Sequence, residues 1–232
     1  MVDREMSRNL LDVKRTQLRI LSLMGAQFNE LEKSILGAGT EREMAAIYGQ
    51  DPLLPFDASL LSNAYGTLNM RKLTGEYTYV HFIPQDEDIK KGTLSIMTTK
   101  IDEWNSLLQS QTGGMIRNVI VIATKSPTQS VTDDIISSLS RYSFTWFRYA
   151  ELYFDITQHS LQPQNVKCLS DAEVGELLKN PGVKPSLLPI IKSSDIFARF
   201  HGWKKGDIVR VEDEDFHVPT AVTVSIEYYL VK

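Results

Sequence analysis

The sequence has a single cysteine, Cys168, among its 232 residues. One thiol cannot form an internal disulfide or a thiolate metal site, and such cysteine usage is typical of a reducing compartment, the cytosol or the nucleus. Histidine is also scarce, and His81, His159, His201 and His217 show neither H-x-x-x-H nor H-E-x-x-H spacing. We therefore expect neither a metal site nor a cofactor.

Long apolar runs and an excess of basic residues are missing too. No stretch approaches membrane-spanning length, and residues 1–5 carry no secretory signal. The 25 Lys and Arg residues are outnumbered by 29 Asp and Glu, which gives a net charge of −4, so any contact with DNA has to be local. We expect an intracellular, soluble protein without a membrane partner, long enough for one large domain or two small ones.

Sequence motifs of catalysis are absent as well. Neither a P-loop nor a G-x-S-x-G elbow occurs. The acidic run Glu212-Asp213-Glu214-Asp215 offers carboxylates, but consecutive side chains on an extended chain point alternately to opposite faces. We interpret this run as a solvated turn rather than as a cation site.

The first part of the chain has helical periodicity. Apolar residues recur at mostly helical spacing over residues 7–36, and Gly25 either divides this segment into two helices or is a packing contact. A short helix is predicted over residues 41–48. A loop with two prolines follows at residues 51–56, and the mixed pattern of residues 57–69 suggests another helix.

Beyond residue 77 the pattern changes to that of strands alternating with helices, which predicts an α/β domain. The stretch 117–124 is apolar at both alternating sets of positions, which is typical of a strand buried on both faces. Helices are predicted over residues 101–109 and through Ile135, Ile136 and Leu139, and residues 111–114 form a flexible break. The predicted strands or strand-like segments cover residues 77–83, 93–97, 117–124, 144–149 and 152–154.

The last part predicts a smaller α+β domain. A helix begins at Ser170, a strand covers residues 188–191, and the final strand covers residues 221–231. Ser194 is expected to cap a short helix that Gly202 ends, and Ile196, Phe197 and Phe200 form its apolar face. A turn over residues 203–207 then leads into a strand at residues 208–211, so this segment reads as a strand–helix–turn–strand unit.

This unit carries a resemblance to a known family, the shared fifth subunit of the eukaryotic nuclear RNA polymerases, which also has an archaeal counterpart. The family pattern is roughly L-P-[KR]-I, a D-P-[VI]-x-[RK] helix, and G-x-[KR]-[KR]-G-[DEQ]-[VI]-[VL]. Residues 155–163 with Leu169 and Ser170 resemble a second family block, N-I-T-x-H-x-L-x-P followed by L-S. The residues that match the first block are Leu188, Pro189, Ile191, Asp195, Ala198, Arg199, Gly202, Lys204, Lys205, Gly206, Asp207 and Val209.

The resemblance implies a non-catalytic subunit of DNA-directed RNA polymerase, acting in transcription in the nucleus, or in the nucleolus if it serves polymerase I alone. It implies an N-terminal jaw domain, residues 1–154, related in fold to restriction-type endonucleases, and a C-terminal assembly domain, residues 155–232, docked on the largest subunit. The archaeal counterpart lacks the jaw, which points to a eukaryotic or viral source. By resemblance, the partner-binding residues are His159, Pro163, Leu188, Pro189, Ile191, Asp195, Arg199, Gly202, Lys204, Lys205 and Gly206.

Under the resemblance, the segment Lys125-Ser126-Pro127-Thr128 corresponds to the loop that approaches downstream duplex DNA at the polymerase jaw. A cation, hydroxyl groups and backbone amides suit contact with phosphate, which positions the duplex without reading bases. The alternative is a helix start, with Ser126 as N-cap and Pro127 at the first helical position. Both interpretations remain open, and one does not exclude the other.

A nuclease is the main catalytic alternative, because the jaw domain is related to restriction-type enzymes. Such enzymes need a metal-binding acid two residues before a lysine on a central strand, and here Ala123 stands at the acid's position before Lys125. Without that carboxylate no metal ion is held to activate water. Two alternatives therefore remain beside a polymerase subunit: a free-standing transcription adaptor and an inactive DNA-binding protein with a nuclease fold.

The sequence departs from the family pattern at its acidic run. The family usually continues with I-I-R-x-S-E-T-A-G-x-Y, whereas this chain has Val211 followed by Glu212-Asp213-Glu214-Asp215. Only Thr220-Ala221 corresponds to the family's T-A. This departure suggests a paralogue dedicated to one nuclear polymerase.

Overall fold

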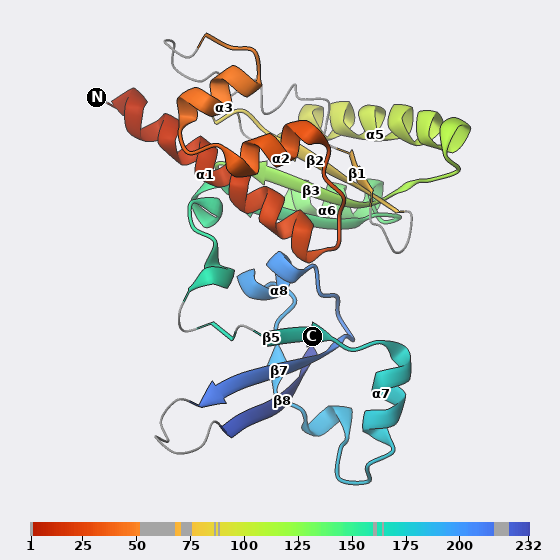
Figure 1. Cartoon of the computed structure of the whole chain (residues 1–232). Helices are drawn as coiled ribbons and strands as arrows, with labels where there is room; N and C mark the ends of the chain where they lie inside the picture. Colours follow the sequence, from red (N-terminus) through yellow and green to blue (C-terminus); the bar gives the residue numbers. More distant parts are fainter. Residues whose placement is uncertain are drawn as a thin grey trace. The chain divides into compact units, whose positions relative to one another are not determined.

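The computed structural model describes residues 2–51, 68–70, 76–85, 87, 89–159, 162–163, 165–215 and 223–232. The chain divides into two compact units, Met1–Phe154 and Asp155–Lys232 (Figure 1). Each unit contains helices and a four-stranded mixed sheet, so the predicted fold class is confirmed. No helix within these described ranges is long and apolar enough to cross a membrane.

The sheet of the first unit has the strand order β1-β2-β3-β4, so β3 is an inner strand. Strands β2, β3 and β4 are parallel, and β1 is antiparallel to β2. Val121 of β3 lies between His81 and Trp146 in register. The bounds are β1 Leu68–Met70, β2 Tyr77–Phe82, β3 Ile116–Ala123 and β4 Ser143–Arg148. Because β3 is buried at every position except Arg117, the predicted doubly buried strand is confirmed.

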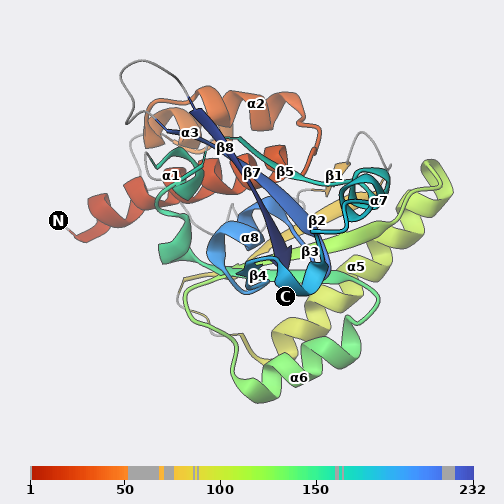
Figure 2. The same cartoon turned by 90° about the horizontal axis from the view of Figure 1, so that it is seen from below.

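Helices cover both faces of this sheet, with α1, α2 and α3 on one side and α5 and α6 on the other (Figures 1 and 2). Side chains of α5 and α6 share a core with Tyr79, Val119 and Val121. On the other side, the ammonium of Lys14 in α1 lies 5.1 Å from the centre of the Phe82 ring. The bounds are α1 Val2–Leu23, α2 Glu30–Gly37, α3 Glu41–Ile47, α5 Lys91–Gln111, α6 Gln129–Ser138 and the 3-10 helix η1 Tyr149–Leu152.

The N-terminal helical segment is divided at Gly25, in agreement with one of the two sequence interpretations. Gly25 has a φ of 77°, a conformation that glycine adopts without steric penalty. The second helix, α2, begins with a capping box, in which Asn29 accepts a hydrogen bond from the Glu32 backbone and the Glu32 carboxylate accepts one from Asn29.

A lysine is buried between the first helix and the sheet. Lys14 is 1% exposed, and its ammonium donates a hydrogen bond of 2.7 Å to Oε1 of Gln17. Burial lowers the pKa of Lys14 to about 8, although the carboxylate of Glu32 opposes this shift. The first unit therefore contains a cation that solvent does not reach.

Three predictions for the first unit are wrong. Residues 93–97, predicted as a strand, lie in α5, because Leu94, Met97 and Ile101 are buried at helical spacing. Residues 152–154 are not strand-like, since the chain turns through η1 after β4. Of the helix predicted over residues 57–69, the last two belong to β1, and residues 57–67 lie outside the described part of the chain.

The sheet of the second unit has the order β5-β7-β8-β6. Strand β7 is antiparallel to both β5 and β8, and the two-residue strand β6 is parallel to β8. Helix α7 begins with a capping box between Ser170 and Glu173, so the helix start predicted at Ser170 is confirmed. The bounds are η2 Ile156–Gln158, β5 Asn165–Cys168, α7 Asp171–Leu178, η3 Pro185–Leu187, β6 Ile190–Ile191, α8 Ile196–His201, β7 Ile208–Asp215 and β8 Thr223–Val231.

The strand–helix–turn–strand unit is present, but its helix cap is not the predicted one. Asp195, not Ser194, is the N-cap of α8, and its carboxylate accepts a hydrogen bond of 2.8 Å from the Phe197 backbone. A turn closed by a bond from the Asp195 N–H to the Lys192 carbonyl precedes the helix, so Asp195 is the last extended residue. Gly202 ends α8 with a φ of 67°, as predicted.

The acidic run is not a turn. Glu212 to Asp215 belong to β7, where they pair with β8 from Ile226 to Thr223. The turn prediction is wrong because hydrogen bonding to β8 extends β7 four residues past the predicted end at Val211. The sequence of the acidic run alone does not indicate this pairing. The acidic residues therefore lie on a paired hairpin strand.

Candidate partner-binding site

The predicted DNA-contacting loop, residues 125–128, joins the carboxyl end of β3 to α6. Lys125, Ser126 and Thr128 are exposed, and Pro127 is half-buried. The helix-start interpretation is wrong in its details, because the N-cap is Thr128 and α6 begins at Gln129. Ser126 and Pro127 precede the cap in irregular backbone, which leaves the loop's role in DNA contact as a prediction.

Ala123 is the last residue of β3 and stands two residues before Lys125. It is 1% exposed and lies opposite Arg148 of β4 in register. Its methyl group offers no oxygen to a metal ion. Among the described residues, no group of three or more His, Cys, Asp and Glu side chains is placed to hold a metal.

In the second unit, α8 and the turn after it form an aromatic cluster. The His201 ring stacks on Trp203 with centroids 4.7 Å apart, and Phe197 lies 4.6 Å from His201. Burial lowers the pKa of His201 to about 4, although the charge of Asp155 opposes this shift. The imidazole is therefore neutral at physiological pH and acts as an apolar ring in this cluster.

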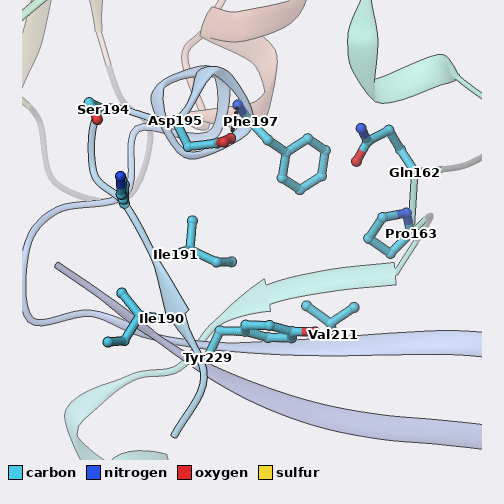
Figure 3. A pocket seen from close by; sticks show the side chains of 10 residues that line it. Gln162, Pro163, Ile190, Ile191, Ser194, Asp195, Phe197, Val211 and Tyr229 are labelled. Carbon is cyan, nitrogen blue, oxygen red and sulfur yellow. Dashed lines mark hydrogen bonds between the residues drawn. The ribbon is translucent and has the colours of Figure 1, made fainter.

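A pocket of about 570 Å³ lies next to this cluster, between α8 and the sheet (Figure 3). Figure 3 shows the Phe197 ring on one side, Val211 and Tyr229 from the strands on the other, and Pro163 closing one end. The register explains the floor, because Val209 pairs with Tyr229 and Val211 follows two residues later on the same face. The complete lining is Gln162, Pro163, Ile190, Ile191, Lys192, Ser194, Asp195, Phe197, Val211 and Tyr229.

The polar groups at this pocket differ in their hydrogen bonds. The carboxylate of Asp195 accepts the capping bond from Phe197, and the Tyr229 hydroxyl donates a bond of 2.5 Å to Glu227. This bond raises the pKa of Tyr229. Lys192 is exposed and has no ion pair among the residues that the structure describes.

The pocket brings together only some of the predicted partner-binding residues. Pro163, Ile191 and Asp195 line it. The others lie elsewhere in the second unit: His159, Leu188, Pro189, Arg199, Gly202, Lys204, Lys205 and Gly206. Their positions are an observation about the fold, and their role in binding stays a prediction.

Several of these other residues shape the turn between α8 and β7. Gly206 has a φ of 101°, and its N–H donates to the Val231 carbonyl, while the Lys204 N–H donates to the Asp207 carboxylate at 2.7 Å. Arg199 donates from Nε to the Ser194 carbonyl. These residues hold the backbone of the strand–helix–turn–strand unit in place.

Sequence reasoning missed most of the pocket lining. Phe197 was predicted on the apolar face of its helix, and Val211 and Tyr229 lie within two predicted strands, but none of them was given a site role. The alternation that places Val211 and Tyr229 on one face is present in the sequence, but the pairing of β7 with β8 is needed to bring them side by side. No motif or periodicity in the sequence around Lys192 indicates a binding site there.

A family model matches the second unit. Residues 154–224 match the model described as RNA polymerase Rpb5, C-terminal domain. The match covers most of the second unit and leaves the first unit outside it except for Phe154. The resemblance inferred from the sequence is thereby confirmed for this part of the chain.

Curated relatives extend the same similarity. The chain is 29% identical over 130 residues to the DNA-directed RNA polymerases I, II, and III subunit RPABC1 of Caenorhabditis briggsae and of Caenorhabditis elegans, covering 56% of this chain and 56% of each relative. It is 35% identical over 83 residues to the DNA-directed RNA polymerase V subunit 5A of Arabidopsis thaliana, covering 35% of this chain and 37% of the relative. The chain thus spans about half the length of the first two relatives.

Proposed function

We propose that this chain is a non-catalytic subunit of a multisubunit DNA-directed RNA polymerase and works in transcription in the nucleus. The observation that carries the proposal is the match of residues 154–224 to the Rpb5 C-terminal domain. The similarity to named polymerase subunits, found in two nematodes and a plant, supports it.

The second unit is proposed to dock on the largest polymerase subunit. Its surface supports this role, since Leu187 is 71% exposed and Ile190 is 54% exposed. Large apolar side chains at a surface lose contact with water when a partner covers them, and this favours binding. The pocket beside α8 adds a concave, largely apolar surface to the same unit.

The first unit is proposed to form part of the lower jaw that holds downstream duplex DNA. Its support is the exposed loop at residues 125–128, whose cation and hydroxyl groups suit contact with phosphate. A relation to restriction-type endonucleases stays a prediction, with which the mixed sheet and its α-helices on both faces are compatible.

Affinity purification of the tagged full chain tests the proposal. We expect the largest subunit and the other core subunits to co-purify in a fixed one-to-one ratio with the chain through a salt wash. Recovery of transcription factors without polymerase, or polymerase in small and variable amounts, would favour the free-standing adaptor instead.

The nuclease alternative is tested with the same purified protein. We expect no cleavage of duplex DNA with Mg²⁺ or Mn²⁺, because a buried alanine stands where a metal-binding acid is needed. Metal-dependent cleavage that disappears in the Lys125→Ala variant would overturn the non-catalytic assignment.

A further inference from the structure

The pocket beside α8 is apolar on opposite sides. Phe197 projects from the helix toward the strand side chains, where Val211 and Tyr229 form the floor (Figure 3). All three are only half-buried, although Phe197 and Val211 pack against a core in which Ala198, Val209 and Val231 are fully buried. The helix therefore covers one part of the sheet face and leaves the adjoining part open.

The volume of this opening suits a protein side chain and its neighbours. At about 570 Å³ it lies within the range of about 300–1,000 Å³ that is typical of binding sites. Aromatic rings facing one another across such a gap favour a bulky apolar side chain, which gains both burial and ring contacts. Because Phe197, Val211 and Tyr229 are only half-buried, a partner that covers them can still gain free energy by burying the rest of their surface.

The charged side chains around the pocket indicate which charged group of a partner would lie beside the inserted apolar side chain. The carboxylates of Asp195 and Glu227 already accept hydrogen bonds, from the Phe197 backbone and the Tyr229 hydroxyl. Lys192 is the lining cation, and no ion pair with it exists within the described ranges. A partner that covers the pocket passes close to this exposed ammonium, and a carboxylate placed against it gains a charge-assisted hydrogen bond.

We propose that the pocket binds an extended segment of a partner protein, which inserts a bulky apolar side chain between Phe197 and Tyr229 and places a carboxylate against Lys192. This inference rests on the proposed function, since it names the chemistry of the segment by which the polymerase partner is held. The apolar group supplies affinity by burial, and the ion pair sets the direction in which the segment lies.

A photo-cross-linking experiment in cells identifies the occupant. The full tagged chain carries Ile190→p-benzoyl-L-phenylalanine, at an exposed position that lines the pocket. After irradiation, we expect cross-links to one segment that has an Asp or Glu within two residues of a Leu, Ile, Met, Phe, Tyr or Trp. The absence of any cross-link, a cross-link to a second copy of this chain, or one to a segment without an acid would overturn the proposal.

Binding of the cross-linked segment is then measured directly. A fluorescein-labelled peptide with that sequence is titrated with the full chain. Lys192→Glu is expected to raise the dissociation constant of the peptide about tenfold or more. Lys184→Glu is the matched control, because it makes the same charge change on an exposed lysine that does not line the pocket. Replacing the Asp or Glu of the peptide by Lys should restore binding to the Lys192→Glu protein.

The result is read separately from the proposed function. Equal binding of wild type, Lys192→Glu and Lys184→Glu to the peptide contradicts the ion pair and overturns the inference, even where polymerase still co-purifies with the wild-type chain. If the cross-linked segment fits the stated chemistry but polymerase does not co-purify, the inference stands and the polymerase assignment fails. Circular dichroism of each variant verifies that the fold is retained.

Discussion

The two units of the molecule differ in how completely they bury their own sheets. In the first unit, β3 is buried at seven of its eight positions, and helices cover both faces. In the second unit, β5 has no buried residue, and Val211 and Tyr229 remain half-buried beside the pocket. A sheet that is already covered gains little from binding, whereas a half-covered face gains by further burial. The family match falls on the unit with the half-covered face.

The units also differ in the ionisable groups whose pKa values burial lowers. In the first unit the pKa of Lys14 is lowered to about 8 and that of His81 to about 4, and in the second unit the pKa of His201 is lowered to about 4. These shifts arise mainly from burial, which disfavours the charged form. Both units should therefore lose stability at acidic pH through a histidine, and the first unit should in addition gain stability at alkaline pH through Lys14.

Truncation of one phenylalanine in each unit tests the difference in burial most strongly. Phe82 is 1% exposed, so Phe82→Ala should lower the free energy of unfolding of the first unit by about 3–5 kcal/mol. Phe197 is half-buried, and Phe197→Ala should cost only about 1–2 kcal/mol in the second unit. Hydrogen exchange measured by mass spectrometry reports each unit separately. Equal losses would contradict the comparison.

Raising the pH should stabilise the first unit through Lys14. Since its folded pKa of about 8 lies below its ordinary value of 10.5, the unfolded chain binds more protons between these values. The free energy of unfolding should therefore rise across this window by about 3 kcal/mol from this group. Denaturant unfolding at pH 7.5 to 9.5, below the ordinary pKa of Tyr48, Tyr79 and Tyr149, should show about 2 kcal/mol of this rise in the wild type and not in Lys14→Met. Lys33→Met, at an exposed lysine, should keep it, and parallel curves for all three proteins would contradict the prediction.

Lowering the pH should destabilise the second unit through His201. Its folded pKa of about 4 lies below the ordinary 6.5, so its contribution is complete above pH 6.5 and is lost as the pH falls toward 4. The loss should be about 1–2 kcal/mol, because solvent reaches part of the ring and screens its charge. His201→Phe keeps a ring against Trp203 without a titrating group, so its unfolding should lose less stability over this window. Hydrogen exchange at pH 6.5 and 4.5 provides the measurement, and equal losses would count against the prediction.

The acidic strand segment should influence which partner the second unit accepts. This prediction rests on the proposed function, and we expect the wild-type chain to enter one nuclear polymerase and to be excluded from the others. Replacing the four acids together by Gln and Asn should loosen this preference several-fold and leave the fold intact, because β7 and β8 pair through their backbones. The variant carries Glu212→Gln, Asp213→Asn, Glu214→Gln and Asp215→Asn.

Quantitative recovery of the three nuclear polymerases with tagged wild type and variant measures this preference. The control for loss of four negative charges alone carries four substitutions at exposed positions outside the acidic run: Asp102→Asn, Glu103→Gln, Asp171→Asn and Glu176→Gln. Equal recovery of the wild-type chain in all three polymerases would refute the role of the segment.

The smallest effect is expected in the first unit, at the predicted DNA loop. Lys125→Glu should reduce the salt dependence of the assembled polymerase's affinity for downstream duplex by about one unit of slope in log affinity against log salt. Lys33→Glu, at an exposed lysine of α2, should leave the slope unchanged. An unaltered slope for Lys125→Glu would leave the loop with no role beyond connecting β3 to α6.

Local signals in the sequence predicted several elements correctly. Gly202 adopts a positive φ and ends α8 where the sequence indicated, and Ser170 caps α7. Gly25 also adopts a positive φ and divides the first helical segment, which is one of the two interpretations that the sequence allowed. Each of these depends on the conformational preference or side-chain chemistry of one residue and its immediate neighbours. The strand β3 was also predictable, because a continuous apolar run from Val119 to Ala123 is typical of a doubly buried parallel strand.

Two predictions failed where the local sequence fitted more than one structure. Five residues at 93–97 fit a strand pattern, but burial of Leu94 and Met97 against the sheet favours the helix α5. Ser194 and Asp195 are both good caps, and the turn that starts at Lys192 decides between them. In both cases the contact that decides the structure involves residues outside the short sequence segment on which the prediction was based.

The sequence by itself determined the α/β class, the doubly buried strand, the strand–helix–turn–strand unit and the family resemblance, because these depend on residue type and spacing along the chain. Tertiary structure alone decided the extent of β7 and the existence of the pocket. The pocket joins Pro163, Phe197, Val211 and Tyr229, which are far apart in sequence and become neighbours only when β7 pairs with β8 and α8 covers one part of their shared face. The physical reason is that strand pairing and face burial depend on partners distant in the chain, and no local pattern specifies which partner that is.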